Sequence, residues 1–321
     1  MPEPLVSVVT PFYNTAPYLA ECIESVQRQS YPHWQHVLVD NCSTDGSSEI
    51  AARYAREDSR ISVVRNEQLL PQVPNYNRAL RCVAPAADFV KVIEADNCLF
   101  PECLAQMVAL ARAHPNVGVV GSYSKTETQL RFTGLSLSSS VVPGRELWHL
   151  HFVNDAYLFG APSTVLMRAD LVRSRQPFYD ECLVVAEDLS ACWDLLRVSD
   201  FGFVHQVLTF VRTENASILS AIKGFEPQAL DRLVLMHRHG RDFMDVPDFE
   251  ATQERIAALY YRALARVILH RQGSGFWKYH RRGLSAEGLK LDRAALVWAV
   301  GRELAGLLAI PRKLGEMVRR R

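Results

Sequence analysis

The sequence lacks the cysteine pattern that would mark a disulfide-rich protein or a cysteine-bound zinc site. Its seven cysteines are an odd number and include no C-x-x-C pair, which favours a reducing compartment. The N-terminal residues show no basic segment followed by an apolar core, so we expect no secretory signal. No uncharged apolar run reaches the roughly 18–20 residues that a membrane-spanning helix needs. These absences predict a cytoplasmic protein.

Two motifs of common nucleotide-binding folds are also missing. No Gly-x-Gly-x-x-Gly follows the first predicted strand, which counts against a nicotinamide-binding Rossmann domain. No Gly-Lys-Ser/Thr occurs either, which disfavours a phosphate-loop nucleotidase. The segment 10–16 has no Gly, Lys or Arg, whereas a sugar nucleotidyltransferase with a similar sheet normally has a glycine-rich, basic loop there. The sequence therefore also disfavours a sugar nucleotidyltransferase.

The chain has little net charge, but its charges are unevenly distributed. The 36 Lys+Arg and 35 Asp+Glu among 321 residues give a formal charge of +1, which excludes a uniformly basic protein, and we expect no nucleic-acid partner. Residues 1–254 contain 21 basic and 31 acidic residues, a charge of −10. Residues 255–321 contain 15 and 4, a charge of +11. An acidic body therefore precedes a basic segment that could meet an anionic partner.

Short apolar runs alternate with helical patterns over the first 120 residues, and we expect strands at Leu5–Thr10, His36–Asp40, Ile61–Val64, Phe89–Ile93 and Val117–Gly121. Thr15 is expected to cap the first helix. This alternation predicts an α/β fold, with a mostly parallel central sheet and flanking helices.

Beyond residue 122 the alternation weakens. Residues 123–145 are rich in Ser and Thr and predict loops or an irregular edge hairpin. Further strands are expected at Ser163–Arg168 and Phe201–Arg212, with a helix at Glu187–Val198 between them. Helical patterns then continue to the end of the chain. We therefore expect an α/β domain at 1–220 and a helical C-terminal extension at 221–321.

Polar residues follow three of the predicted strands, namely Thr10-Pro11-Phe12-Tyr13-Asn14, Asp40-Asn41 and Glu94-Ala95-Asp96-Asn97. Ligands of open α/β sheets bind at the carboxyl ends of strands. Alternation places Glu94 and Asp96 on the same side, where two carboxylates could hold a divalent cation or simply cap a helix.

Four segments resemble the family 2 glycosyltransferases in order and spacing: VSVVTPFYN at 6–14, VLVDNCSTDGS at 37–47, VKVIEADNCLFPECL at 90–104 and the pair Glu187-Asp188. The resemblance covers roughly residues 5–215. It implies an A-type nucleotide-sugar-binding fold and a nucleoside-diphosphate-sugar donor. Residues 1–220 would then form the nucleotide-sugar-binding catalytic domain.

The resemblance also implies roles for individual residues on the donor side. The donor would contact Thr10, Pro11, Tyr13, Asn14, Asp40, Asn77, Arg78, Glu94, Ala95 and Asp96. Asp96 would bind Mg²⁺ or Mn²⁺, and Glu94 would touch ribose or metal-bound water. The sequence departs from the family pattern in three places: Glu94 replaces the first Asp of its D-x-D, and Asn97 and Asn41 each replace a frequent further Asp.

On the acceptor side, Asp188 matches the family's catalytic base, and Gly160, Pro162, Ser163 and Glu187 would lie near the sugar or the acceptor. Taken from the residues alone, Glu187 and Asp188 are more typical of an acidic first helical turn than of a catalytic pair. With the resemblance, the sequence predicts an inverting, metal-dependent glycosyltransferase that uses a UDP- or dTDP-sugar and a glycan or lipid-linked acceptor in surface polysaccharide synthesis. The alternative from another class is a non-catalytic nucleotide-sugar-binding or scaffolding protein of the same fold.

The segment 294–310 (AALVWAVGRELAGLLAI) is apolar except for Arg302 and Glu303, and basic residues follow it. Three interpretations stay open. The helix could pack on the catalytic domain, form a homodimer through the C-terminal helices, or lie on an anionic membrane, peripherally on its inner face.

Overall fold

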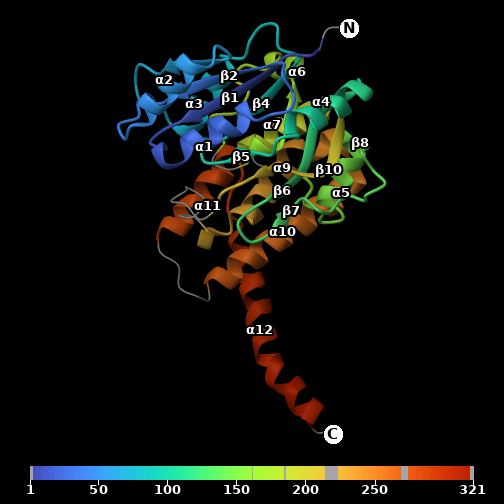
Figure 1. The fold of residues 1–321 in the computed structure, drawn as a ribbon. Helices are drawn as coiled ribbons and strands as arrows, with labels where there is room; N and C mark the ends of the chain where they lie inside the picture. The colour runs from blue at the N-terminus through green and yellow to red at the C-terminus, as the bar shows by residue number, and fades with distance from the viewer. Residues whose placement is uncertain (1–2, 161, 184–185, 214–222, 269–273, 319–321) are drawn as a thin grey trace. The chain divides into compact units, whose positions relative to one another are not determined.

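The structure is a computed structural model, and it describes the chain except for residues 1–2, 161, 184–185, 214–222, 269–273 and 319–321 (Figure 1). The chain divides into two compact units. The first consists of Met1–Glu181 and Glu187–Asn215, and the second of Cys182–Ala186 and Ala216–Arg321. The domain boundary predicted at residue 220 lies outside the described residues.

The first unit is built on one mixed sheet. Its strands are β1 (Val6–Phe12), β2 (Trp34–Asp40), β3 (Ile61–Arg65), β4 (Phe89–Val92), β5 (Cys98–Leu99), β6 (Val117–Lys125), β9 (Leu166–Arg168) and β10 (Asp200–Phe210), in the order β3–β2–β1–β4–β9–β6–β10–β5. The pairs β1–β2, β2–β3, β1–β4 and β6–β10 are parallel, whereas β9 and β5 are antiparallel to their neighbours. The predicted fold class is confirmed.

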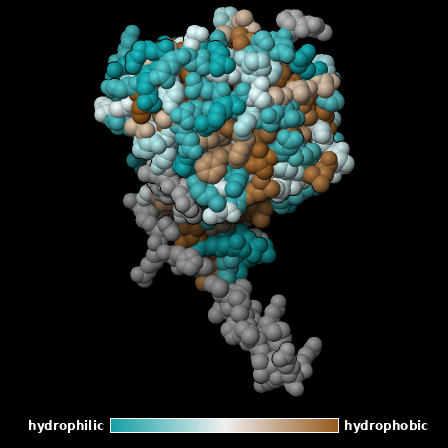
Figure 2. Space-filling view, viewed as in Figure 1, coloured by the Kyte–Doolittle hydropathy of each residue, from teal (hydrophilic) through white to brown (hydrophobic). Residues whose placement is uncertain are grey.

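Helices cover this sheet: α1 (Ala16–Gln27), α2 (Ser47–Glu57), α3 (Gln72–Leu80), α4 (Cys103–Ala113), α5 (Gly144–Phe152), α6 (Ala169–Arg173) and α7 (Glu187–Leu196). One core joins α1, α2 and α4 to the strands, with Leu19 and Ile23 of α1 and Met107 of α4 fully buried. Their spacing of three or four residues puts each apolar stripe against the sheet. On the face drawn in Figure 2, hydrophilic side chains cover most of this unit, and hydrophobic ones gather toward its centre.

The cap of α1 differs from the prediction. Thr15 precedes the helix, but its side chain makes no capping hydrogen bond. Instead, the carboxylate of Asp45 accepts a hydrogen bond of 2.9 Å from the backbone N–H of Ala16, and Ser47 Oγ accepts one of 2.9 Å from that of Thr15. The α1 N-terminus is therefore held by the loop that follows β2, which is distant in sequence.

The region after residue 122 is more regular than the sequence predicts. Strand β6 continues to Lys125, and two short strands, β7 (Leu130–Arg131) and β8 (Val141–Pro143), join the sheet as antiparallel partners of β6 and β10. The strand predicted at Ser163–Arg168 begins as a 3₁₀ turn at Pro162–Thr164 and becomes β9 only at Leu166.

The second unit is helical, with a short turn at Lys223–Phe225 and the helices α9 (Pro227–Phe243), α10 (Val246–Ile268), α11 (Ser274–Ala286) and α12 (Arg293–Val318). Its core contains Leu230 of α9, Ile256, Tyr260 and Leu264 of α10, and Phe276 of α11. Among the described residues, no helix has both the length and the apolar character that crossing a membrane requires.

Candidate active site

Asp40, the last residue of β2, is buried and organises the loop that follows it. Its carboxylate accepts hydrogen bonds from the backbone N–H of Ser43 at 2.8 Å and from Ser48 Oγ at 2.5 Å. The exposed guanidinium of Arg65, at the end of β3, lies 3.6 Å from the same carboxylate. The loop, the start of α2 and the end of β3 are thus tied to the strand end at which we expect the nucleoside.

Asn41 serves this region through its amide, which a carboxylate could not replace. Its Oδ1 accepts hydrogen bonds from Asn66 and from the backbone N–H of Leu70, each at 2.9 Å, and its Nδ2 donates to the carbonyl of Leu70. Asn66 also donates to Asn75 Oδ1 on α3. An Asp at position 41 would lose the donor, so this departure from the family pattern fits the local hydrogen bonds.

The residues predicted at the end of β1 divide into buried and exposed groups. Thr10 is fully buried, and its hydroxyl bonds His36 Nε2 at 2.8 Å, so the Thr10 side chain faces the interior of the fold. Pro11 is also buried, whereas Tyr13 and Asn14 are exposed. Asn14 has a positive φ of 50°, and its Oδ1 accepts a hydrogen bond from the backbone N–H of Thr44. Tyr13 and Asn14 are therefore the two of these side chains that a ligand can reach.

The turn after β4 is organised by the side chain of Glu94. Its Oε2 accepts hydrogen bonds from Asn97 Nδ2 at 2.9 Å and from Ser163 Oγ at 3.0 Å, and Ser163 Oγ also accepts one from the backbone N–H of Glu94. Burial, followed by the charge of Asp96, raises the pKa of the Glu94 carboxyl to about 7, and the charge of Asp188 acts in the same direction. Glu94 is therefore held by protein donors, and its carboxyl exchanges its proton near neutral pH.

Asp96 lies at the same turn, partly exposed, and Ala95 between them is buried. Arg212, just after β10, fixes the backbone of this turn. It donates from Nε to the carbonyl of Asp96 at 3.1 Å and from its backbone N–H to Asn97 Oδ1 at 2.9 Å. Its guanidinium also pairs with Glu21 at 2.9 Å. Arg212 thus ties the Asp96 carbonyl and the Asn97 side chain to the end of β10.

Asn77 and Arg78 do not share one environment. The buried amide of Asn77 accepts a hydrogen bond from the backbone N–H of Tyr179 and donates to the carbonyl of Tyr179, both at 2.8 Å, and donates to Glu181 at 3.0 Å. Its side chain therefore anchors the 179–181 segment. Arg78 is partly exposed, and its guanidinium donates to Cys82 Sγ at 3.4 Å, one helical turn away.

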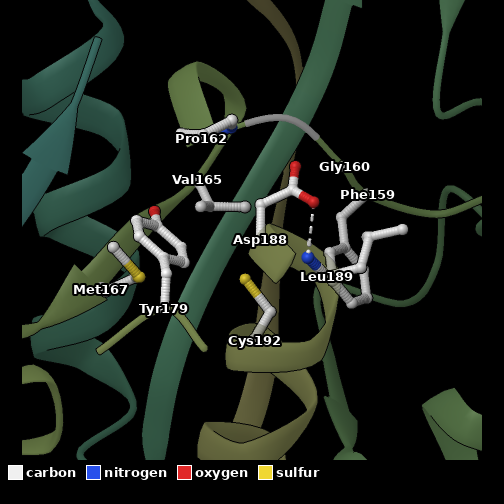
Figure 3. Close-up of a pocket in the computed structure, with 9 residues that line it drawn as sticks. All are labelled: Phe159, Gly160, Pro162, Val165, Met167, Tyr179, Asp188, Leu189 and Cys192. Atoms are coloured by element: carbon white, nitrogen blue, oxygen red, sulfur yellow. Dashed lines mark hydrogen bonds between the residues drawn. The ribbon is translucent and has the colours of Figure 1, made fainter. Parts of the chain in front are cut away.

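Asp188 lines a small cavity with Gly160, Pro162, Tyr179 and Cys192 (Figure 3). The carboxyl group of Asp188 points toward the turn that carries Gly160 and Pro162 and away from Cys192, and its Oδ1 accepts a hydrogen bond of 2.7 Å from the backbone N–H of Leu189. The cavity volume is about 10 Å³, which is enough for one water molecule. Asp188 itself is partly exposed.

Glu187 precedes Asp188 at the start of α7 and shares its surroundings. Burial, followed by the charge of Asp188, raises the pKa of the Glu187 carboxyl to about 7. Ala186, directly before the pair, has a φ of 56°, in the left-handed region that residues with a Cβ rarely adopt. Backbone strain of this kind is concentrated at functional sites.

Two tyrosines that were not predicted as site residues join the acidic groups. Tyr76 donates from its hydroxyl to Glu94 Oε1 at 3.4 Å, and its ring lies edge-on to that of Tyr179, with centroids 6.1 Å apart. Burial raises the pKa of both tyrosines, and negative charges that include Glu94 and Glu187 raise it further. Tyr76 lies inside the motif NYNR, but no sequence signal marks Tyr179, which is brought here by Asn77.

The carboxylates of the β4 turn fit a hard divalent cation. No group of three or more His, Cys, Asp or Glu in the part of the chain that is described could hold a metal alone. However, Mg²⁺ is usually bound through one or two carboxylates together with phosphate oxygens and water. The partly exposed carboxylate of Asp96 is the ligand that this turn offers, because Oε2 of Glu94 already accepts two protein hydrogen bonds.

Comparison with known proteins connects these observations. A family model described as "Glycosyl transferase family 2" matches residues 7–173. The chain is 45% identical over 78 residues to the putative teichuronic acid biosynthesis glycosyltransferase TuaG of Bacillus subtilis, a match that covers 24% of this chain and 31% of that protein. The matched part thus spans about a third of the length of this relative.

Two solved structures share the fold at low sequence identity. The S. aureus TarS fragment 1–349 in complex with UDP-GlcNAc has a TM-score of 0.61 and 17% identity, with 94% of this chain and 92% of that chain covered. The mannosyltransferase PcManGT from Pyrobaculum calidifontis, in complex with GDP-Man and Mn²⁺, has a TM-score of 0.60 and 17% identity, with 97% and 81% covered. Because the family model matches more than half of the sequence, this chain belongs to glycosyl transferase family 2.

Proposed function

We propose that this chain transfers a sugar from a nucleoside-diphosphate-sugar to a hydroxyl group, with inversion at the anomeric carbon and with Mg²⁺ or Mn²⁺ bound. The observation that carries the proposal is the meeting of two acidic turns. Ser163 donates a hydrogen bond to Glu94 at 3.0 Å, and its neighbour Pro162 lines the same cavity as Asp188. Burial raises the pKa of Glu94, and the charges of Asp96 and Asp188 act in the same direction. The candidate metal ligand Asp96 and the candidate base Asp188 thus belong to turns that meet, as a single displacement between diphosphate and acceptor requires.

In the proposed reaction, Asp188 acts as the general base. The acceptor oxygen attacks the anomeric carbon opposite the diphosphate, the new C–O bond forms as the bond to the diphosphate oxygen breaks, and the acceptor proton passes to the Asp188 carboxylate. Asp96 would hold the cation, which when bound neutralises charge on the departing nucleoside diphosphate. Burial and the charge of Asp188 raise the pKa of Glu187 and favour its protonated form, which can donate a hydrogen bond to a sugar hydroxyl.

The remaining predicted residues have supporting parts in this proposal. Asp40, Tyr13 and Asn14 border the strand ends where the nucleoside would lie, and Ser163 positions Glu94. Asn77 acts indirectly through Tyr179. The donors bound by the structural neighbours are UDP-GlcNAc and GDP-Man, and the name of the Bacillus relative refers to teichuronic acid biosynthesis. We propose a UDP- or dTDP-sugar donor, as the sequence predicts, and a glycan or lipid-linked acceptor in surface polysaccharide synthesis; of the donors named, UDP-GlcNAc agrees with this choice and GDP-Man does not.

The test is a screen of nucleotide sugars for release of nucleoside diphosphate, with Mn²⁺, Mg²⁺ or chelator, on wild type and Asp188→Asn. We expect turnover with metal and its loss with chelator. Asp188→Asn should keep donor affinity within about threefold and lower the transfer rate by roughly 10²–10⁴-fold, the usual contribution of a general base.

Asp194→Asn is the matched control, because Asp194 lies on the same helix but pairs with Arg175, and its turnover should stay close to wild type. Normal turnover by Asp188→Asn would remove the assignment of the base. Turnover without metal would remove the role of Asp96. Donor binding without any turnover would instead favour the non-catalytic binding protein.

A further inference from the structure

A groove lies between α11 and the start of α12, within the second unit. Its volume is about 560 Å³, inside the range of about 300–1,000 Å³ typical of small-molecule sites. Trp277, Leu284 and Leu296 contribute apolar walls, and Arg281, Lys290 and Arg293 contribute cations. Among the side chains that the structure describes, no acidic one lines it. The groove therefore combines an apolar surface with concentrated positive charge.

The three cations of the groove are available to an anionic ligand. Arg281 donates from Nε to the carbonyl of Trp277 at 3.2 Å, which orients the guanidinium without neutralising it. In the described part of the chain, none of the three forms an ion pair. Arginine and lysine presented together in this way are suited to a phosphate group.

The outer face of α12 next to the groove is apolar. Val297 is 72% exposed, Trp298 61% and Leu304 45%, whereas Ala299 between them is buried. The guanidinium of Arg302 lies 4.8 Å from the centre of the Trp298 ring. An exposed Trp with a neighbouring Arg on an apolar helical face is typical of helices that lie in a membrane interface, with the ring at the level of the headgroups.

We infer that the groove and this face of α12 dock the C-terminal unit on a bilayer that contains anionic phospholipid. A lipid phosphate contacts Arg281, Lys290 and Arg293, and its acyl chain follows the apolar walls of the groove. Trp298 and Val297 enter the interface beside it. Charge complementarity selects this occupant, because residues 255–321 carry 15 basic and only 4 acidic residues. A soluble phosphate would leave both apolar surfaces in water.

The test measures partition of the full chain onto sedimented vesicles of phosphatidylcholine, with or without about 30 mol % phosphatidylglycerol, at low ionic strength. We expect binding to the anionic vesicles, weakened by salt. The triple variant Arg281→Gln, Lys290→Gln, Arg293→Gln should bind roughly 100-fold more weakly, because each basic residue near an anionic surface strengthens partition about fivefold. The control is Arg56→Gln, Arg81→Gln, Arg112→Gln, which removes the same charge from exposed positions of the first unit and should bind within about threefold of wild type.

Three further measurements decide between this occupant and others. Trp298→Ala should weaken vesicle binding, and the tryptophan emission of the wild type should shift to shorter wavelength on binding. Inorganic phosphate at millimolar concentration should compete only weakly; if it displaced the protein fully, the groove would be a site for a soluble anion and the inference would be wrong. The inference would also be overturned if the control triple variant lost as much vesicle binding as the groove variant. A stable dimer in sedimentation analysis that Trp298→Ala dissociates would overturn it as well. Nucleotide binding by the groove variants should be unchanged, so the outcome is independent of the proposed transfer activity.

Discussion

The carboxyl group of Glu94 should make the free energy of unfolding depend on pH, and Glu94→Gln isolates this dependence. The pKa of Glu94 is raised from an ordinary value of 4.5 to about 7 in the folded chain, first by burial and then by Asp96. Between these two values the folded chain keeps a proton that the unfolded chain has lost. The unfolding free energy should therefore fall as pH rises through this window and level off above about pH 7.

The expected magnitude follows from the two pKa values. One pKa unit corresponds to about 1.4 kcal/mol, and integration between pH 5.5 and pH 8.5 gives a loss of about 2 kcal/mol for this one group. Gln cannot ionise, so the variant lacks this loss. Its amide oxygen can keep the hydrogen bonds from Ser163 and Asn97 that Oε2 of Glu94 accepts, with the NH₂ group on the side of Tyr76.

The assay is urea unfolding of the full chain, wild type and variant, at both pH values. The transition of the first unit is followed by circular dichroism, with chelator and without nucleotide. We expect the wild type to lose about 2 kcal/mol more than Glu94→Gln between pH 5.5 and pH 8.5. Titration of Glu187 is common to both proteins and cancels to first order. Glu57→Gln, at an exposed position of α2, is the control. If wild type and Glu94→Gln lost the same stability, the reasoning from burial and charge would be refuted.

Three further substitutions, and a fourth as a control, test other contacts by urea unfolding and nucleotide titration. Thr10→Val removes the hydroxyl that bonds buried His36 and should lower the unfolding free energy by about 1–3 kcal/mol. Its nucleotide affinity should stay within twofold of wild type. A large loss of nucleotide affinity would instead show that Thr10 contacts the donor. Asn77→Ala removes three hydrogen bonds to the 179–181 segment and should cost about 3 kcal/mol; a cost below about 1 kcal/mol would argue against an anchoring role. Gly144→Ala would place a Cβ atom 1.9 Å from the carbonyl oxygen of Leu196 and should lower the unfolding free energy by more than about 2 kcal/mol. Gly301→Ala is the control, because a Cβ atom there meets open space. It should leave the unfolding free energy unchanged or raise it by up to about 1 kcal/mol.

Much of the fold is readable from the sequence because its signals are local. The apolar runs that end at Thr10, Asp40 and Ile93 predict strands within a few residues of β1, β2 and β4. Parallel strands bring their carboxyl ends to one edge, so the polar residues that follow them can be named as candidate site residues from the sequence alone. The region after residue 122 is harder to predict, since β7, β8 and β9 are two or three residues long and depend on partners elsewhere in the sheet.

The contacts that hold the candidate site together are not local, and no spacing rule reveals them. Ser163 meets Glu94 across 69 residues, and Asn77 meets Tyr179 across 102. From its position in the sequence, Asp45 is expected to bond the start of α2, which follows it closely. Its carboxylate does so at Ser47, but it also accepts a hydrogen bond from the first residue of α1. In each case the local sequence predicts the secondary structure in which the residue lies, but not the distant residue to which it is hydrogen-bonded. Tyr179 illustrates the limit, because its backbone is held by Asn77, 102 residues away in the sequence.

The two departures from the family pattern in the β4 turn make physical sense together. Glu94 is longer than the Asp it replaces, and its Oε2 bonds both Ser163 and Asn97. Asn97 donates to Glu94 through Nδ2 and accepts from the backbone N–H of Arg212 through Oδ1. An Asp at position 97 could not donate, and it would add a third carboxylate beside Glu94 and Asp96, where the pKa of Glu94 is already raised. The neutral Asn97 thus accommodates Glu at position 94, and Asp96 is left as the carboxylate of this turn best placed to meet a cation.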